Sequence, residues 1–207
     1  MNYKEIRSTA LLYADRKDDQ ELVADQFAAI QSFMRIVETR VQRFLQTRHQ
    51  SKRAYITTSL DKEVYSLPCD FSGLRTIGLK ANLASPVYMT LEYATPLDMT
   101  WNNSADQVYY TIIGNTLQLS HQIDSKILEI VYYQDIPKLT NDEDTNWVSI
   151  KYPDVLIFGL LVEINSFAKD PEAATLWDGR FQSALNDIEF EDQKDRWSGT
   201  PLVIRSV

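Results

Sequence analysis

The stretch VADQFAAIQSFMRIVETRVQRF, residues 23–44, carries the strongest pattern in the chain. Its large apolar side chains recur in alternating steps of four and three, at Val23, Phe27, Ile30, Met34, Val37, Val41 and Phe44. Because an α-helix has about 3.6 residues per turn, this spacing keeps them on one face. It predicts a long amphipathic helix packed on its own domain. The opposite side carries Arg35, Arg40 and Arg43.

The sequence around this stretch extends the helical prediction over residues 1–53. Asp18, with Glu21 three residues later, resembles a capping box that would begin the long helix. Residues 6–14 form a shorter apolar pattern before it, which predicts a second helix.

Between residues 54 and 139 the apolar residues alternate with polar ones, which is typical of β-strands. Six or seven short strands at this spacing predict a β-sandwich or barrel. Gly114-Asn115 separates two such strands, residues 109–113 and 116–119, and is a signal for a two-residue hairpin.

Residues 140–197 return to a helical pattern. Residues 155–168 are apolar nearly all round, which indicates a buried helix interrupted by Glu163. Asp170-Pro171-Glu172 has the order of cap, proline and acid that begins a helix. We expect that helix to bury the following apolar side chains: Leu176, Trp177, Phe181, Ala184, Leu185 and Ile188.

The predicted fold class is therefore α+β. Its N- and C-terminal helices, residues 1–53 and 140–197, form a helical bundle. A central antiparallel β-sandwich or barrel module, residues 54–139, is inserted between them. Residues 198–207, with Pro201 and alternating apolar side chains, are expected to form an extended C-terminal arm.

Charge and composition narrow the classes of function. The net charge is −8, and it divides into +3 over residues 1–53, −4 over 54–139 and −7 over 140–207. An acidic chain is a poor candidate for wrapping DNA, because affinity for phosphates comes from lysine and arginine. Cys69 is the only cysteine, so no internal disulfide can form. The longest apolar run, residues 155–162, is much shorter than the roughly 20 residues of a membrane span, so we expect a soluble protein.

Residue patterns that support catalysis are largely missing. His49 and His121 lie far apart in the sequence, the six glycines are scattered, and residues 141–144 lack the glycine and terminal glutamate of a calcium loop. Glu163 in an apolar helix is best explained by an arginine partner. We therefore expect no enzyme activity, no metal and no cofactor.

Several phrases, in order along the chain, resemble the head-to-tail adaptor (neck or connector) proteins of short-tailed bacteriophages. They are YSLPCDF (65–71), GNTLQL (114–119), LEIVYY (128–133), TNW (145–147), YPD (152–154), GLL (159–161), AKD (168–170) and RWSGTPL (196–202). The resemblance implies a virion protein, assembled in the host cytoplasm, that forms a homo-oligomeric ring of twelve copies. Its expected partners are the portal protein above and a tail or nozzle protein below, with DNA only in transit and no membrane.

The resemblance and the charge pattern together select candidate residues. Contacts with the portal or a neighbouring subunit are expected from helix, loop and arm positions: Arg35, Arg40, Arg43, Trp101, Trp197, Pro201, Leu202, Ile204 and Arg205. An acidic channel wall that repels DNA phosphates is expected at Asp187, Glu191, Asp192 and Asp195.

Two other functions stay open at this point. The β-module could bind a host glycan or receptor through Trp101, Tyr109 and Tyr110, which a ring of aromatic side chains on one exposed sheet face would favour. A hydrolase would need a cleft that holds two close carboxylates with shifted pKa values.

Overall fold

The computed structural model describes residues 1–207 except 18, 20–21, 23–27, 87, 101–106 and 198–207. The chain divides into two compact units. A helical unit comprises residues 1–49 and 136–207, and a β unit comprises residues 50–135. The described residues thus give an α+β protein with five α-helices and two sheets, which confirms the predicted class.

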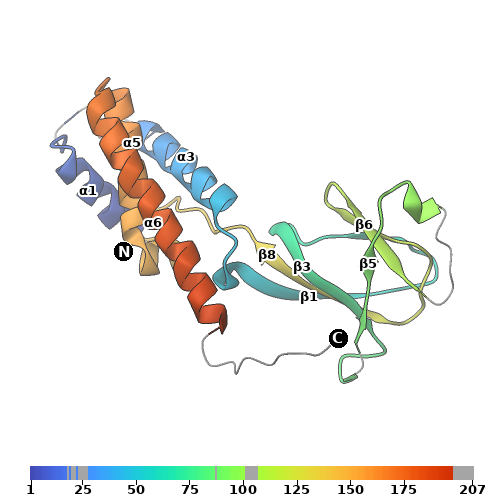
Figure 1. Cartoon of the computed structure of the whole chain (residues 1–207). Helices are drawn as coiled ribbons and strands as arrows, with labels where there is room; N and C mark the ends of the chain where they lie inside the picture. The colour runs from blue at the N-terminus through green and yellow to red at the C-terminus, as the bar shows by residue number, and fades with distance from the viewer. Residues whose placement is uncertain (18, 20–21, 23–27, 87, 101–106, 198–207) are drawn as a thin grey trace. The chain divides into compact units, whose positions relative to one another are not determined.

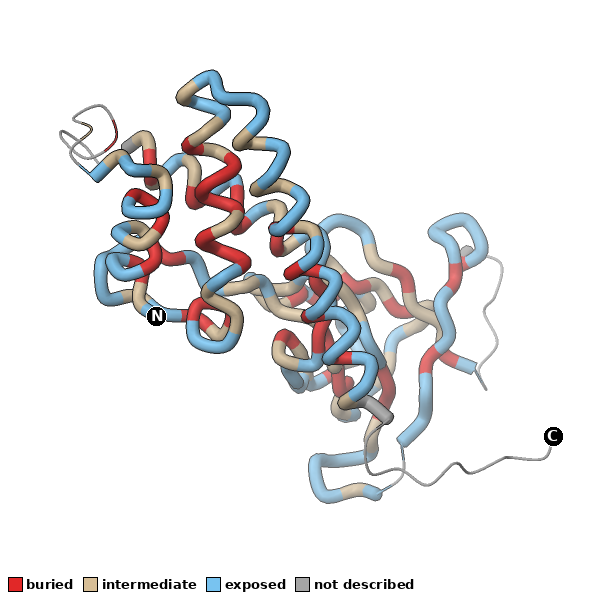
Figure 2. Tube along the Cα trace, turned by 60° about the vertical axis from the view of Figure 1, so that its left-hand side comes forward, coloured by how far each residue is buried: buried red, intermediate tan, exposed pale blue. Residues whose placement is uncertain are grey.

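The helical unit is built around one buried helix. Its elements are α1 (Tyr3–Tyr13), α3 (Ala28–Phe44), α4 (Trp147–Lys151), α5 (Pro153–Phe167) and α6 (Pro171–Trp197). Figure 1 shows α1, α3 and α6 running alongside α5, and each of them packs against it. The residues coloured as buried in Figure 2 lie along these helices, and they form one hydrophobic core. This arrangement explains why residues 155–164 are apolar nearly all round, with Glu163 as the exception.

Local sequence signals begin these helices. The Asp170 carboxylate accepts the backbone N–H of Ala173 at 3.0 Å, and Pro171 is the first residue of α6, which confirms the predicted start. Asn146 caps α4 through a capping box with Ser149. Asp18 and Glu21, the predicted start of the long helix, lie outside the described residues.

Two inward-facing predictions were wrong. Ile30, Met34, Val37 and Val41 are buried as expected, but Phe44, at the last position of α3, is 39 % exposed. Leu176 is 56 % exposed. Five residues along a helix turn a side chain by about 140°, so Leu176 lies almost opposite the fully buried Phe181.

The β unit contains two four-stranded sheets that share one hydrophobic core. One has the order β1-β8-β3-β4, from β1 (Ser51–Thr57), β8 (Ile127–Gln134), β3 (Phe71–Lys80) and β4 (Met89–Thr90). The other has the order β2-β7-β6-β5, from β2 (Val64–Ser66), β7 (Thr116–Leu119), β6 (Tyr109–Ile113) and β5 (Glu92–Tyr93). β1 begins at Ser51, inside the segment that the sequence assigned to helix.

The hairpin signal is confirmed, and one pairing corrects the expectation of purely antiparallel strands. β6 and β7 pair antiparallel around Gly114, whose φ of 60° is a backbone conformation that favours glycine. β5 pairs with β6 in parallel. This parallel contact consists of two residue pairs, Glu92 with Tyr109 and Tyr93 with Tyr110. It is too short to leave a pattern in the sequence.

Candidate functional site

A groove with a volume of about 260 Å³ lies between α3 and α6 on the helical unit. Its lining combines aromatic, aliphatic and cationic side chains: Arg40, Arg43, Phe44, Phe181, Gln182 and Leu185. Both helices reach this position because they pack on α5 at Gly159. A Cβ atom at Gly159 would lie only 2.4 Å from Val37 Cγ1 and 3.2 Å from Phe181 Cε2. The missing side chain of Gly159 therefore allows α3 and Phe181 to approach so closely.

Arg40 forms one wall of the groove and is held by three contacts. Its guanidinium lies 2.6 Å from Asp178 and 3.6 Å from Glu163, and it stacks over the Phe181 ring at 4.8 Å. The ion pair with Glu163 confirms the prediction that an arginine explains this acid within an apolar helix. Since two carboxylates already neutralise Arg40, its role within the unit is to fix α3 against α5 and α6.

Arg43 and Phe44 form the open rim of the same groove. The Arg43 Nε donates to the backbone carbonyl of Thr39 at 3.4 Å, and its side chain is exposed. In the described part of the chain, no carboxylate lies within ion-pair distance of Arg43. Arg35 is also exposed, but it does not line the groove. The structure therefore brings together two of the three predicted arginines, and it adds Phe44, which the sequence assigned to the core.

The four predicted channel-wall acids have different surroundings. Asp192 is 7 % exposed, and its carboxylate accepts the backbone N–H of Arg48 at 2.9 Å. Asp195 pairs with the Arg48 guanidinium. Glu191 accepts a hydrogen bond from the Tyr152 hydroxyl at 3.0 Å, and burial together with this carboxylate raises the pKa of Tyr152 to about 12. Asp187 is exposed on α6. A role in a channel wall stays a prediction for all four.

The remaining predicted contact residues cannot be placed. Trp101, Pro201, Leu202, Ile204 and Arg205 lie outside the described residues. Trp197 is the last residue of α6, and its side chain also lies outside the description.

Phe190 is an exposed aromatic residue on the helical unit that was not predicted from the sequence. Phe190 on α6 is 70 % exposed. It stands within NDIEFEDQ, residues 186–193, a strongly acidic stretch. Large apolar side chains surrounded by charges on a surface mark contact sites, and that contrast is the signal by which it could have been found.

The two tyrosines predicted to bind a glycan, Tyr109 and Tyr110, lie on different faces of their sheet. Tyr109 and Tyr110 are adjacent in β6, so their side chains point to opposite sides of the sheet. Tyr110 packs against the core, where its ring meets Tyr93 edge-on at 5.8 Å. Tyr109 and Tyr110 therefore do not share one exposed face of the sheet, as the glycan-binding hypothesis expected of them.

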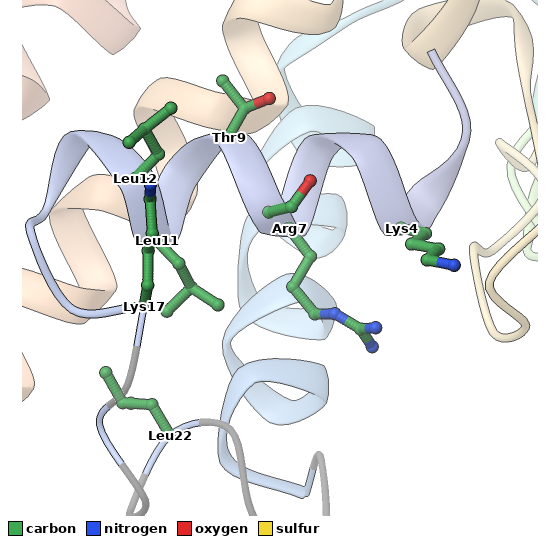
Figure 3. Close-up of a pocket in the computed structure, with 8 residues that line it drawn as sticks. Lys4, Arg7, Thr9, Leu11, Leu12, Lys17 and Leu22 are labelled. Atoms are coloured by element: carbon green, nitrogen blue, oxygen red, sulfur yellow. The ribbon is translucent and has the colours of Figure 1, made fainter.

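A second hollow, of about 530 Å³, lies beside α1. Figure 3 shows Lys4 and Arg7 extending from α1, and Leu22 on the segment that follows it. Arg7 pairs with Asp142 at 3.2 Å, and the Ser8 hydroxyl donates to the Glu5 carbonyl at 3.0 Å. The described lining contains no acid, histidine or cysteine, and the Ser8 hydroxyl donates to a backbone carbonyl and not to a base.

His49 lies in a basic environment, where a metal ion would be unfavourable. Its Nε2 is 3.2 Å from Lys151 Nζ, and its ring packs against Trp147 at 5.4 Å. Burial and the neighbouring Lys151 and Arg48 lower the pKa of His49. Across the residues that the structure covers, no three metal-ligating side chains gather. No helix among those residues is long and apolar enough to cross a bilayer.

The sequence model of a protein family described as SU10 adaptor protein matches residues 1–205. No curated protein matches the chain.

Proposed function

Since the chain belongs to the SU10 adaptor protein family, we propose that it is the ring-forming head-to-tail adaptor of a bacteriophage virion. Membership confirms the resemblance to phage head-to-tail adaptors, and it implies a structural, non-enzymatic component of the virion that interacts with other phage structural proteins. The match over residues 1–205 carries the proposal, because it includes the helical unit and the whole β unit.

The finer parts of the proposal concern assembly. Twelve copies form a closed ring that binds the portal protein and offers a platform to the next tail or nozzle protein. Each copy needs two different surfaces for such a ring, because contacts in a ring are heterologous. The helical unit supports this requirement with an open groove on one side of α6 and the exposed Phe190 on the same helix.

We assign different roles to the two units. We interpret the helical unit as a bundle that carries the contacts between subunits. We interpret the β unit as a sandwich that presents a surface to a neighbouring component. Residues 198–207 act as an arm that attaches to a partner subunit, with Pro201, Leu202, Ile204 and Arg205 as its contact residues.

The proposed DNA passage rests on charge. The C-terminal part of the chain, residues 140–207, has a net charge of −7. An acidic wall made by Asp187, Glu191, Asp192 and Asp195 repels phosphates, so DNA passes without being bound. An assembled structure with these acids on the outside of the ring would overturn this assignment.

Negative-stain electron microscopy of the chain, alone and mixed with the cognate portal, tests the proposal. Rings, or added density on the portal, are the expected result. A monomer that does not bind the portal would refute the adaptor role and favour a binding function of the β unit surface.

Deletion of residues 198–207 provides a matched test of the arm. The shortened chain is expected to fold, with unchanged circular dichroism, and to lose attachment to its partner subunit. Normal attachment of the shortened chain would refute the role of the arm while leaving the adaptor proposal intact.

A further inference from the structure

Phe190 is an apolar side chain on an acidic surface of α6. Its exposed fraction of 70 % is among the largest of the described hydrophobic residues. Asp187 and Glu189 are exposed close to it, and neither makes a hydrogen bond or ion pair within the described part of the chain. Lys194 follows one helical turn further along α6.

The α3–α6 groove has the opposite character. Its floor is apolar, formed by the buried Phe181 and Leu185, and its rim carries the exposed Arg43. Arg40 contributes little free charge, because Asp178 and Glu163 neutralise it. Thus an apolar groove with a cationic rim and an apolar side chain with acidic neighbours lie on the same molecule.

The groove and Phe190 lie on different faces of one helix. Leu185 lines the groove, and Phe190 follows it by five residues, a turn of about 140° around the helix axis. Phe190 therefore cannot enter the groove of its own chain, whereas both surfaces of one copy can be occupied at once by two neighbours. A contact of this kind is heterologous, which is the type that builds rings.

We propose that Phe190 of one copy inserts into the α3–α6 groove of a second copy, with Asp187 and Glu189 facing Arg43. This inference rests on the proposed ring and names the surfaces that would join its subunits. It assigns Asp187 to that contact, which leaves the proposed channel wall to Glu191, Asp192 and Asp195. Charge complementarity orients the two copies, and burial of the aromatic side chain supplies affinity.

The test is the association state of purified full-length chains, measured by mass photometry and sedimentation velocity. Wild-type chain is expected to form rings or shorter oligomers. Phe190→Ala removes the inserted ring and is expected to weaken association roughly ten- to a hundredfold. Because Phe190 is exposed, this variant keeps the fold, which circular dichroism verifies.

Charge reversal makes the test specific. Arg43→Glu and Asp187→Arg are each expected to give monomers. In a mixture of the two, every contact between unlike variants joins opposite charges, so alternating copies are expected to assemble into rings again. The double variant Arg43→Glu/Asp187→Arg is expected to form rings again. Lys4→Glu on α1 and Asp124→Arg in the β unit change exposed charges that belong to neither surface, and these controls should assemble like wild type.

Each result decides between the proposals. Single reversals that assemble normally, or a double variant that stays monomeric, would overturn the docking of Phe190 while rings of the wild type keep the adaptor role. A wild-type chain that stays monomeric in solution would also overturn the inference, and density on the portal would then still support the adaptor role.

Discussion

Gly159 is the position at which a single methyl group should distort the helical unit most. An ideal Cβ there would lie 2.4 Å from Val37 Cγ1, 3.0 Å from Val37 Cγ2 and 3.2 Å from Phe181 Cε2. Favourable carbon–carbon contacts lie at about 3.5–4.0 Å, so the closest one is more than an ångström too short. Val37 is fully buried and its branched side chain is stiff in a helix, so α3 itself must shift.

The expected loss of stability follows from two opposing effects. Overpacking of a core costs about 1–3 kcal/mol, and an overlap this severe belongs at the upper end. Alanine is favoured over glycine in a helix by about 1 kcal/mol, which offsets part of that cost. We therefore expect Gly159→Ala to lower the free energy of unfolding by about 1–2 kcal/mol, as measured by urea denaturation followed by circular dichroism.

Gly179 in α6 is the matched control. A Cβ there would meet no atom within 4 Å, and the residue is exposed. Gly179→Ala should therefore raise the free energy of unfolding by about 0.5–1 kcal/mol, with the opposite sign. In a Val37→Ala background, Gly159→Ala should lose most of its cost. If Gly159→Ala stabilises the protein as much as Gly179→Ala, the close approach of α3 to α5 is wrong.

Three further changes test the contacts described above. Ile30→Ala removes a fully buried side chain of α3 and should cost about 2–5 kcal/mol in urea denaturation, whereas a near-silent result would mean that this face is not packed. The same expectation for Phe27→Ala concerns a residue outside the described part. Arg40→Ala leaves Glu163 without its cation and uncovers Phe181, so it should lower the free energy of unfolding by about 1–3 kcal/mol. Arg40→Lys should restore only part of that stability, since lysine lacks the planar guanidinium that stacks on the ring. Full restoration by lysine would contradict the stacking. Asp70 accepts hydrogen bonds from Lys52 at 2.7 Å and from Tyr132 at 2.9 Å. The bond from Lys52 is the main cause that lowers the pKa of Asp70. The stability that Asp70 provides is thus present above its unfolded pKa of about 4 and is lost as the pH falls through the lowered value, so the deficit of Asp70→Asn in urea should shrink toward pH 2; a deficit that is independent of pH would refute this contribution.

The features that the sequence predicted correctly depend on neighbouring residues. The Gly114 hairpin, the buried α5 and the start of α6 at Pro171 each follow from conformational preferences within a few positions. The Arg40–Glu163 pair was predictable in kind, because a charge in an apolar helix needs a partner. Which arginine supplies it depends on how α3 packs on α5.

The groove could not be predicted from the sequence, because it joins parts of the chain that are far apart in sequence. It joins Phe44 and Arg43 to Phe181 and Leu185, more than a hundred positions later, through a helix that contributes Gly159. Periodicity placed Phe44 in the core, because it reports a preferred face but not where the packed part of the helix ends. Leu176 was assigned to the core as an apolar residue, although it lies almost opposite Phe181 on α6. The parallel pairing of β5 with β6 was missed for the same reason, since pairing partners are set by the tertiary fold.

The division of the chain has a consequence for its synthesis. The β unit is one continuous segment, residues 50–135, whereas the helical unit needs residues from both sides of it. On the ribosome, α1 and α3 emerge first with buried faces that have no cover, because α5 and α6 are translated only after the β unit. The β unit can therefore fold before the N-terminal helices have α5 and α6 to pack against. A nascent chain that stalls before α5 leaves Ile30, Met34, Val37 and Val41 open to chaperones and proteases, although the segment between them and the ribosome is already folded.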